Sequence, residues 1–141
     1  SPVDALMFAA DRVLHYFGEI KKKLSEGFIV ISDRYVESSI VYQSSESDEI
    51  SLDWIKDVNK FAEKPDITII LDIDPKISLA RKQKENLDKF ENINFLGKVR
   101  TLYLRRAKEE GYYIVNTDDI IELAQEKIQQ IVIKKLKDFK L

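Results

Sequence analysis

The sequence predicts an α/β fold in which a parallel sheet carries helices on both faces. Three short apolar runs, at residues 28–32, 67–71 and 112–115, are typical of strands. Around and between these runs, apolar residues recur every three or four positions, which is typical of helices. Because strands and helices alternate along a chain of 141 residues, we expect one domain with a parallel sheet.

The first predicted helix begins at the first residues of the chain. Ser1 is a suitable cap, and Pro2 fits the first helical position because its ring presets the backbone angle. Apolar residues follow at helical spacing as far as Leu24. Gly27 marks the end of this helix, since glycine readily adopts the conformation that closes a helix.

The run 28–32 is the first predicted strand, and Asp33, Arg34 and Tyr35 follow it. Four apolar residues in succession favour a strand buried on both faces. Ligands of open α/β sheets bind beyond the carboxyl ends of the strands. There an Asp can orient Mg²⁺ and an Arg can bind phosphate through two parallel hydrogen bonds. A structural strand that ends in a surface ion pair explains these residues equally well when they are considered alone.

The other elements follow from the same spacing rules. Further helices are predicted over residues 36–43, 51–61, 75–80, 95–110 and 120–137. The segment 44–49 is polar and is expected to be an exposed loop. The segment 81–94 is highly charged and has little apolar periodicity. A crossover helix at the start of a parallel sheet needs a strand before it, so we expect roughly 30 or more residues to precede Ser1 in the natural protein.

Composition narrows the class of protein. The chain has 23 basic and 25 acidic residues and a net charge of −2, which argues against a general nucleic-acid binder. It contains no cysteine, which excludes disulfides and thiolate metal sites and favours the cytosol. The apolar runs are too short to span a bilayer, so no membrane insertion is expected.

Several ordered segments of the chain resemble thymidylate kinases. They are Leu6–Arg12, Asp33–Gln43, Leu71–Pro75, Asp88–Glu91, and Phe95–Arg100 with Tyr103. The resemblance covers almost the whole chain. It implies a three-layer P-loop kinase fold with a five-stranded parallel sheet, a homodimer, and Mg²⁺-dependent transfer of the γ-phosphate of ATP to dTMP.

The chain departs from the family pattern in two respects. It contains no G-x-x-x-x-G-K-[ST] motif, which the family carries on its first strand. It also lacks the family's second phosphate-binding arginine. We therefore expect the first strand, or strands, and the ATP phosphate cradle to lie outside this chain.

The predicted site for the base combines two helices. Phe8 and Arg12 are four residues apart and share a helix face. Spacing alone favours Phe8 in the core and Arg12 at its rim, whereas the resemblance implies that Phe8 stacks on thymine and Arg12 donates to its exocyclic oxygen. Ser39 shares a face with Tyr42 and Gln43. The resemblance implies that Ser39 and Gln43 lie near the base and Tyr42 against the sugar, while an ordinary capped helix is the alternative.

The resemblance assigns the phosphate chemistry to Asp33 and Arg34. Arg34 then binds the phosphate of dTMP, and Asp33 helps to place Mg²⁺ and the acceptor oxygen. Tyr35 is expected to provide packing support. On this interpretation Asp33 and Arg34 are catalytic, Asp33 is the metal-side residue, and Arg34 also contributes to substrate binding.

The charged segment 81–94 matches the mobile lid of the family. A basic loop of this kind can close over ATP and neutralise developing charge. The resemblance implies that Arg81 lies on adenine and that Lys82 contacts ATP. Lys84 is the candidate for the transition-state role, although Lys89 leaves the choice among lysines open, and such a run is as often only a solvated loop. Thr117 follows the last strand, where the family loop runs beside adenine mostly through backbone atoms.

Three other titratable residues are interpreted as structural. Asp74 followed by Pro75 indicates a helix start, and Asp72 ends a strand. His15, the only histidine, has no ligand cluster near it in the sequence.

Two rival functions also fit the sequence. One is a kinase of another pyrimidine nucleotide or nucleoside, and the other is a non-catalytic nucleotide-binding or interaction module, which the missing P-loop favours.

Overall fold

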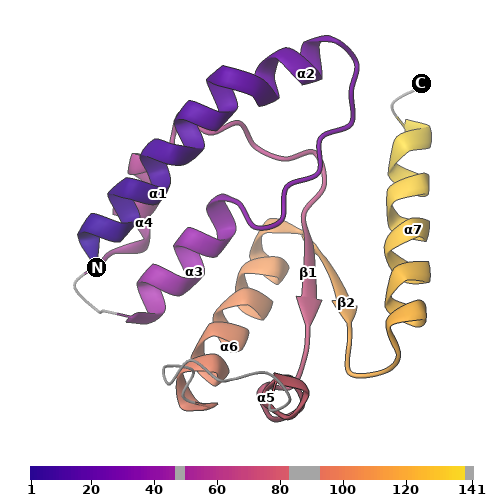
Figure 1. The fold of residues 1–141 in the computed structure, drawn as a ribbon. Helices are drawn as coiled ribbons and strands as arrows, with labels where there is room; N and C mark the ends of the chain where they lie inside the picture. The colour runs from indigo at the N-terminus through magenta and orange to yellow at the C-terminus, as the bar shows by residue number, and fades with distance from the viewer. Residues whose placement is uncertain (47–49, 83–92, 139–141) are drawn as a thin grey trace. The chain divides into compact units, whose positions relative to one another are not determined.

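The computed structural model describes residues 1–46, 50–82 and 93–138 (Figure 1). The chain divides into two compact units, Ser1–Lys64 and Pro65–Leu141. None of the helices in the described residues has an apolar stretch long enough to cross a membrane.

The first unit begins with a nearly continuous helical run. It consists of α1 (Pro2–His15), the π-helical turn η1 (Tyr16–Ile20) and α2 (Lys21–Ser25). Ser1 caps α1 as predicted, since its side chain accepts a hydrogen bond from the backbone N–H of Asp4. Gly27 follows α2 with φ of 82°, a left-handed conformation that glycine adopts without a steric cost. The predicted first helix is therefore confirmed, with one wider turn inside it.

Two further helices complete this unit. They are α3 (Val36–Glu46) and α4 (Leu52–Val58), and Ser51 caps α4 through a hydrogen bond from the backbone N–H of Trp54. The core of the unit is a cluster of Ile40, Ile50 and Ile55, which are at most 5% exposed. Helix α1 contacts both α3 and α4 (Figure 1). These contacts bring three segments that are distant in sequence to one place.

The predicted strand at 28–32 is wrong for this structure. These residues form no regular secondary structure, and the side chains from Phe28 to Ile31 are between 36% and 91% exposed. A strand needs the backbone hydrogen bonds of a neighbouring strand, and none of the described residues pairs with this run. The apolar pattern alone therefore does not create a strand here.

The second unit contains the two strands of the described residues. β1 (Ile69–Asp72) pairs in parallel with β2 (Tyr113–Asn116), and Ile69 lies opposite Tyr113. The strands are connected through α5 (Pro75–Lys82) and α6 (Ile93–Glu110), and α7 (Ile121–Asp138) follows β2 (Figure 1). Both strands begin one or two residues later than predicted. The α/β class with a parallel sheet is confirmed, while the five-stranded sheet implied by the resemblance stays a prediction.

Candidate functional site

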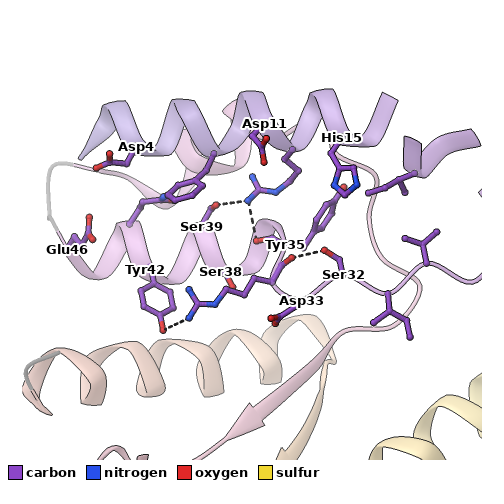
Figure 2. Close-up of a pocket in the computed structure, with 17 residues that line it drawn as sticks. Asp4, Asp11, His15, Ser32, Asp33, Tyr35, Ser38, Ser39, Tyr42 and Glu46 are labelled. Atoms are coloured by element: carbon purple, nitrogen blue, oxygen red, sulfur yellow. Dashed lines mark hydrogen bonds between the residues drawn. The ribbon is translucent and has the colours of Figure 1, made fainter. Parts of the chain in front are cut away.

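The first unit contains a cavity of about 710 Å³ between its helices and the segment that follows α2. Figure 2 shows that Asp11 and His15 of α1, Ser39 and Tyr42 of α3, and the connecting segment around Asp33 all border it. Every residue predicted to bind dTMP lies along this one cavity. These residues are Phe8, Arg12, Arg34, Ser39, Tyr42 and Gln43, and Asp33, which is predicted to be catalytic and to hold the metal, lines it as well.

Helix α1 contributes an aromatic ring and a guanidinium to the cavity, one turn apart. Phe8 is 57% exposed and lines the cavity, so the interpretation that spacing alone favoured, a core position, does not hold. Arg12 is partly buried and also lines the cavity. Its guanidinium donates to Ser39 Oγ over 2.9 Å and to the Tyr35 carbonyl over 3.4 Å (Figure 2). It also donates to Asn59 Oδ1.

Burial and charge act on Arg12 and Tyr35 together. The Arg12 guanidinium lies 5.5 Å from the centre of the Tyr35 ring, within the range of a cation–π interaction. Burial lowers the pKa of Arg12, because desolvation disfavours a charged group. Burial likewise raises the pKa of the Tyr35 phenol, against the opposing effect of the Arg12 charge. Tyr35 contacts Arg12 through both its ring and its carbonyl, beyond the packing role predicted for it.

Helix α3 places polar side chains on the opposite wall. Ser39 and Gln43 are each 5% exposed, and the side chains of Ser38 and Tyr42 line the cavity beside them. Within the described residues, the side-chain carbonyl oxygen of Gln43, Oε1, accepts no hydrogen bond. A buried polar atom without a partner is costly, and a ligand with an N–H group could satisfy it.

Arg34 has an unusual backbone conformation at the edge of the cavity. Its φ is 64°, in the left-handed region that residues other than glycine rarely adopt. The Ser32 hydroxyl donates to the Arg34 carbonyl over 2.8 Å (Figure 2). The guanidinium lies 4.9 Å from the centre of the Tyr42 ring and donates to the Tyr42 hydroxyl over 3.4 Å. Strained residues of this kind cluster at functional sites, and both Asp33 and Arg34 are exposed at the cavity.

In the second unit, Arg81 binds the loop that contains Thr117. The Arg81 guanidinium donates to the carbonyl of Thr117 over 2.8 Å, to that of Asp118 over 2.7 Å and to that of Asp119 over 3.0 Å. The Thr117 hydroxyl in turn donates to the carbonyl of Asp72 over 3.0 Å. Two residues predicted to contact ATP therefore lie together, although whether Arg81 covers adenine stays a prediction.

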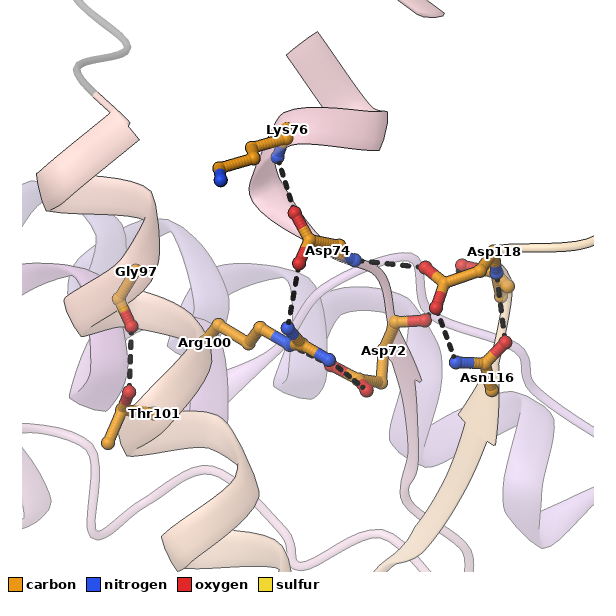
Figure 3. A network of polar contacts seen from close by, with 9 residues as sticks. Asp72, Asp74, Lys76, Gly97, Arg100, Thr101, Asn116 and Asp118 are labelled. Carbon is orange, nitrogen blue, oxygen red and sulfur yellow. Dashed lines mark hydrogen bonds and ion pairs between the residues drawn. The ribbon is translucent and has the colours of Figure 1, made fainter. Parts of the chain in front are cut away.

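A network of polar contacts holds the carboxyl end of β1 (Figure 3). Arg100 forms two hydrogen bonds with the Asp72 carboxylate, of 2.7 and 2.9 Å, and lies 3.6 Å from a carboxylate oxygen of Asp74. The hydrogen bond to Asp72 raises the pKa of Arg100. The Asn116 side chain and the backbone N–H of Asp74 both donate to Asp118, and they lower its pKa. The structural interpretation of Asp72 is consistent with these contacts.

The remaining predicted residues are the lysines of the lid, whose side chains the structure does not describe, and His15, which it does. Lys82 is the last residue of α5, and its side chain is outside what the structure describes. Lys84, Lys89 and the predicted lid between 83 and 92 lie outside the described residues. His15 is exposed, and its Nε2 lies 3.5 Å from a Glu19 carboxylate oxygen. Among the described residues, no group of three or more carboxylates and histidines is arranged to hold a metal ion alone.

Asn59, which contacts Arg12 from the end of α4, was not among the predicted site residues. The signal was weak: a single polar residue directly after the apolar face of a short helix. Only the packing of α1 against α4 brings Asn59, 47 residues along the chain, to the guanidinium.

Known proteins that match this chain over most of its length are probable thymidylate kinases. Residues 3–128 match the model of the family described as thymidylate kinase. A probable thymidylate kinase of Pyrobaculum aerophilum is 51% identical over 115 residues, which are 81% of this chain and 59% of the relative. That of Caldivirga maquilingensis is 38% identical over 94% of this chain and 65% of its own length.

The match extends to a methanogen. A probable thymidylate kinase of Methanococcus aeolicus is 41% identical over 97% of this chain and 70% of its own length. The chain spans less than two thirds of the length of the Pyrobaculum and Caldivirga relatives. By the family model and by these identities, the chain belongs to the thymidylate kinase family.

Proposed function

We propose that the protein containing this chain is a dTMP kinase, which converts ATP and dTMP to ADP and dTDP. One observation carries the proposal: Phe8 and Arg12 of α1 line the same cavity as Arg34 and Gln43, which come from a separate part of the sequence. Its volume suits a small-molecule site. The names of the relatives support the same activity.

The residues of α1 and α3 recognise the base. The exposed ring of Phe8 offers a face for stacking on thymine, and Arg12 donates to an exocyclic oxygen. The free Oε1 of Gln43 accepts from the ring N–H of thymine. Ser39 lies beside them, and Tyr42 lies against the sugar, where its ring crowds a 2′-hydroxyl.

Asp33 and Arg34 act on the phosphate. Arg34 binds the phosphate of dTMP and offsets its repulsion from the incoming γ-phosphate. Asp33 helps to place the phosphate oxygen of dTMP that accepts the γ-phosphoryl group. Mg²⁺ is commonly bound by one or two carboxylates together with substrate phosphates and water, so the exposed Asp33 carboxylate at the cavity fits this ion. When bound, Mg²⁺ supplies charge neutralisation between the phosphates.

The ATP side of the reaction is proposed for the second unit. The loop at Thr117 and the side chain of Arg81 contact adenine, and Lys82 and Lys84 contact the phosphates of ATP, with residues 81–94 as a lid. The proposal requires a phosphate-binding loop that these 141 residues do not contain. The lack of cysteine is consistent with a reaction in the cytosol.

A homodimer through the exposed face of α1 and the start of η1 is part of the proposal. Five exposed apolar residues follow one another at alternating spacings of four and three residues, as in helices that pack together: Val3, Met7, Ala10, Leu14 and Phe17. Two copies of such a stripe are self-complementary about a twofold axis. Sedimentation velocity should show a dimer that Leu14→Glu converts to a monomer. Phe61→Glu, at an exposed aromatic residue outside the stripe, should leave the dimer intact.

The activity itself is tested with the protein that contains this chain. We expect kcat/KM with ATP and Mg²⁺ to be highest for dTMP among dTMP, dUMP, UMP, CMP and thymidine. A different preferred acceptor would support the rival kinase. Binding of dTMP without turnover would support the non-catalytic module.

A further inference from the structure

Asn59 is a buried polar residue that does not line the cavity but reaches a residue that does. It follows the last residue of α4 and is only 3% exposed. Its side-chain Nδ2 donates to the Ile55 carbonyl over 2.8 Å, and its Oδ1 accepts from Arg12 Nη1. Both ends of the amide therefore have partners, and one of them lies at the cavity.

The three acceptors of Arg12 come from three different segments. They are Oδ1 of Asn59, Oγ of Ser39 and the backbone carbonyl of Tyr35. Each is uncharged, so none of them neutralises the guanidinium. An arginine has five N–H donors in a rigid plane, and these three bonds leave up to two for a ligand.

Asn59 differs from the other two acceptors in its position. Ser39 and Tyr35 line the cavity themselves, whereas Asn59 holds the guanidinium from the protein side. An aspartate there would compensate the positive charge of Arg12, and an apolar residue would leave Nη1 without this acceptor. An amide orients the guanidinium and leaves its charge available to a ligand oxygen.

We propose that Asn59 is a positioning residue that holds the Arg12 guanidinium in the orientation that binds the base of the nucleotide. This inference rests on the proposed function, since it takes the ligand of Arg12 to be the base of dTMP. Its expected effect is on nucleotide affinity and not on the rate of phosphoryl transfer, because Arg12 contacts the base and not the reacting phosphate.

A purely structural role is the competing explanation, because Asn59 also ties α1 to the end of α4. The chain offers a matched control for that role. The Tyr16 hydroxyl donates to Glu63 over 2.9 Å, and so joins the residue just after α1 to the segment just after Asn59. Neither Tyr16 nor Glu63 lines the cavity. Tyr16→Phe removes this second tie without touching Arg12.

The test measures dTMP affinity by calorimetry on the protein that contains this chain. Asn59→Ala should weaken binding about tenfold, the size expected for a hydrogen bond to a charged group. Asn59→Ser should have the same effect with less loss of stability, because its hydroxyl is too short for Arg12 but can still donate to the Ile55 carbonyl. Tyr16→Phe should leave the affinity within twofold of wild type.

A double-mutant cycle separates the two roles. In an Arg12→Met background, Asn59→Ala should change the dTMP affinity less than twofold, since there is no guanidinium to position. An equal loss in both backgrounds, or a similar loss in Tyr16→Phe, would overturn the proposal. In kinase assays Asn59→Ala should raise KM for dTMP and leave kcat within twofold, and a lowered kcat with unchanged KM would also contradict it.

The outcomes for Asn59 and for the proposed function can be told apart. A wild-type protein that binds dTMP without phosphorylating it contradicts the kinase proposal, while the affinity cycle still judges Asn59. Normal kinase activity with equal losses in both backgrounds contradicts only the role of Asn59. A wild-type protein that does not bind dTMP overturns both.

Discussion

Two parts of this molecule have nearly the same sequence pattern and different structures. Phe28–Ile31 and Ile67–Leu71 are both largely apolar runs; aspartate follows the second directly, at Asp72, and the first after one serine, at Asp33. The second run contributes β1, in which Ile70 is 9% exposed and the strand pairs with β2. The first run is irregular, and Ile31 is 91% exposed. The difference shows that an apolar run becomes a strand only where another strand accepts and donates its hydrogen bonds.

The charged residues after the two runs also differ, in their burial and in their contacts. Asp72 is 11% exposed at its side chain and is bound by two hydrogen bonds from Arg100. Asp33 and Arg34 are exposed and line a cavity. An acidic residue at the end of an apolar run therefore has a structural role in one unit and a candidate functional role in the other, and its partners distinguish the two.

The largest effect that we expect from this comparison is in amide hydrogen exchange. The backbone N–H of Tyr113 donates to Thr68 and that of Thr117 donates to Asp72, whereas no such bond is found for Ile29–Ile31 in the described residues. In the 141-residue chain, the first two amides should exchange about 1,000-fold more slowly than the last three. Exchange followed by NMR measures this ratio.

Equal protection of both runs in this chain would contradict the difference described between them. Protection of Ile29–Ile31 that arises only in a longer protein would support it. It would mean that residues outside this chain supply the neighbouring strand, as the sequence pattern predicts.

The next largest effect concerns Arg34, which follows the first apolar run and lines the cavity. In the protein containing this chain, Arg34→Ala should lower kcat/KM for dTMP by about 100-fold or more, because charge-assisted contacts to the phosphate are lost. Steady-state kinetics with dTMP varied measures the effect. Arg34→Lys keeps the charge but not the planar fork, so it should restore activity only in part. Unchanged kinetics in Arg34→Ala would remove this residue from the mechanism.

At the end of β1 we expect the reverse of the Arg34 result, namely a loss of stability without a loss of dTMP binding. Arg100→Met should lower the free energy of unfolding by about 1–3 kcal/mol, because it leaves the largely buried Asp72 carboxylate without its two hydrogen bonds. KM for dTMP should stay within twofold of wild type. Urea unfolding and the kinase assay give the two measurements. A large rise in KM with normal stability would mean that Arg100 belongs to the nucleotide site.

The smallest effect is in the acid dependence of stability. Hydrogen bonds from Asn116 and from the backbone of Asp74 lower the pKa of Asp118 below its ordinary value of 3.8. A depressed carboxyl pKa stabilises the folded state above the unfolded pKa, and this contribution is lost as the pH falls through the folded value. Asp118→Asn should therefore flatten the stability profile below about pH 4. Urea unfolding between pH 2 and pH 5 measures it, and an unchanged slope would contradict this role.

The candidate site was largely predictable from local pattern and resemblance. The four-residue spacing of Phe8 and Arg12 put both on one helix face, and the turn of helix from Ser39 to Gln43 gave the facing set. Spacing alone did not reveal that Phe8 faces a cavity and not the core, because helical periodicity identifies a face without identifying what lies against it. The left-handed backbone of Arg34 was not predictable either, since residues other than glycine rarely adopt this conformation.

The helices, their caps and the chemistry of the site residues could be read from local sequence. These depend on interactions within a few positions, such as the bonds that Ser1 and Ser51 make three residues along the chain. Only the tertiary structure decided that 28–31 would not form a strand, that Asp72 would pair with Arg100, and that Asn59 would reach Arg12. Each of these depends on a partner that is distant in the sequence or absent, and the packing of the chain alone brings such partners together.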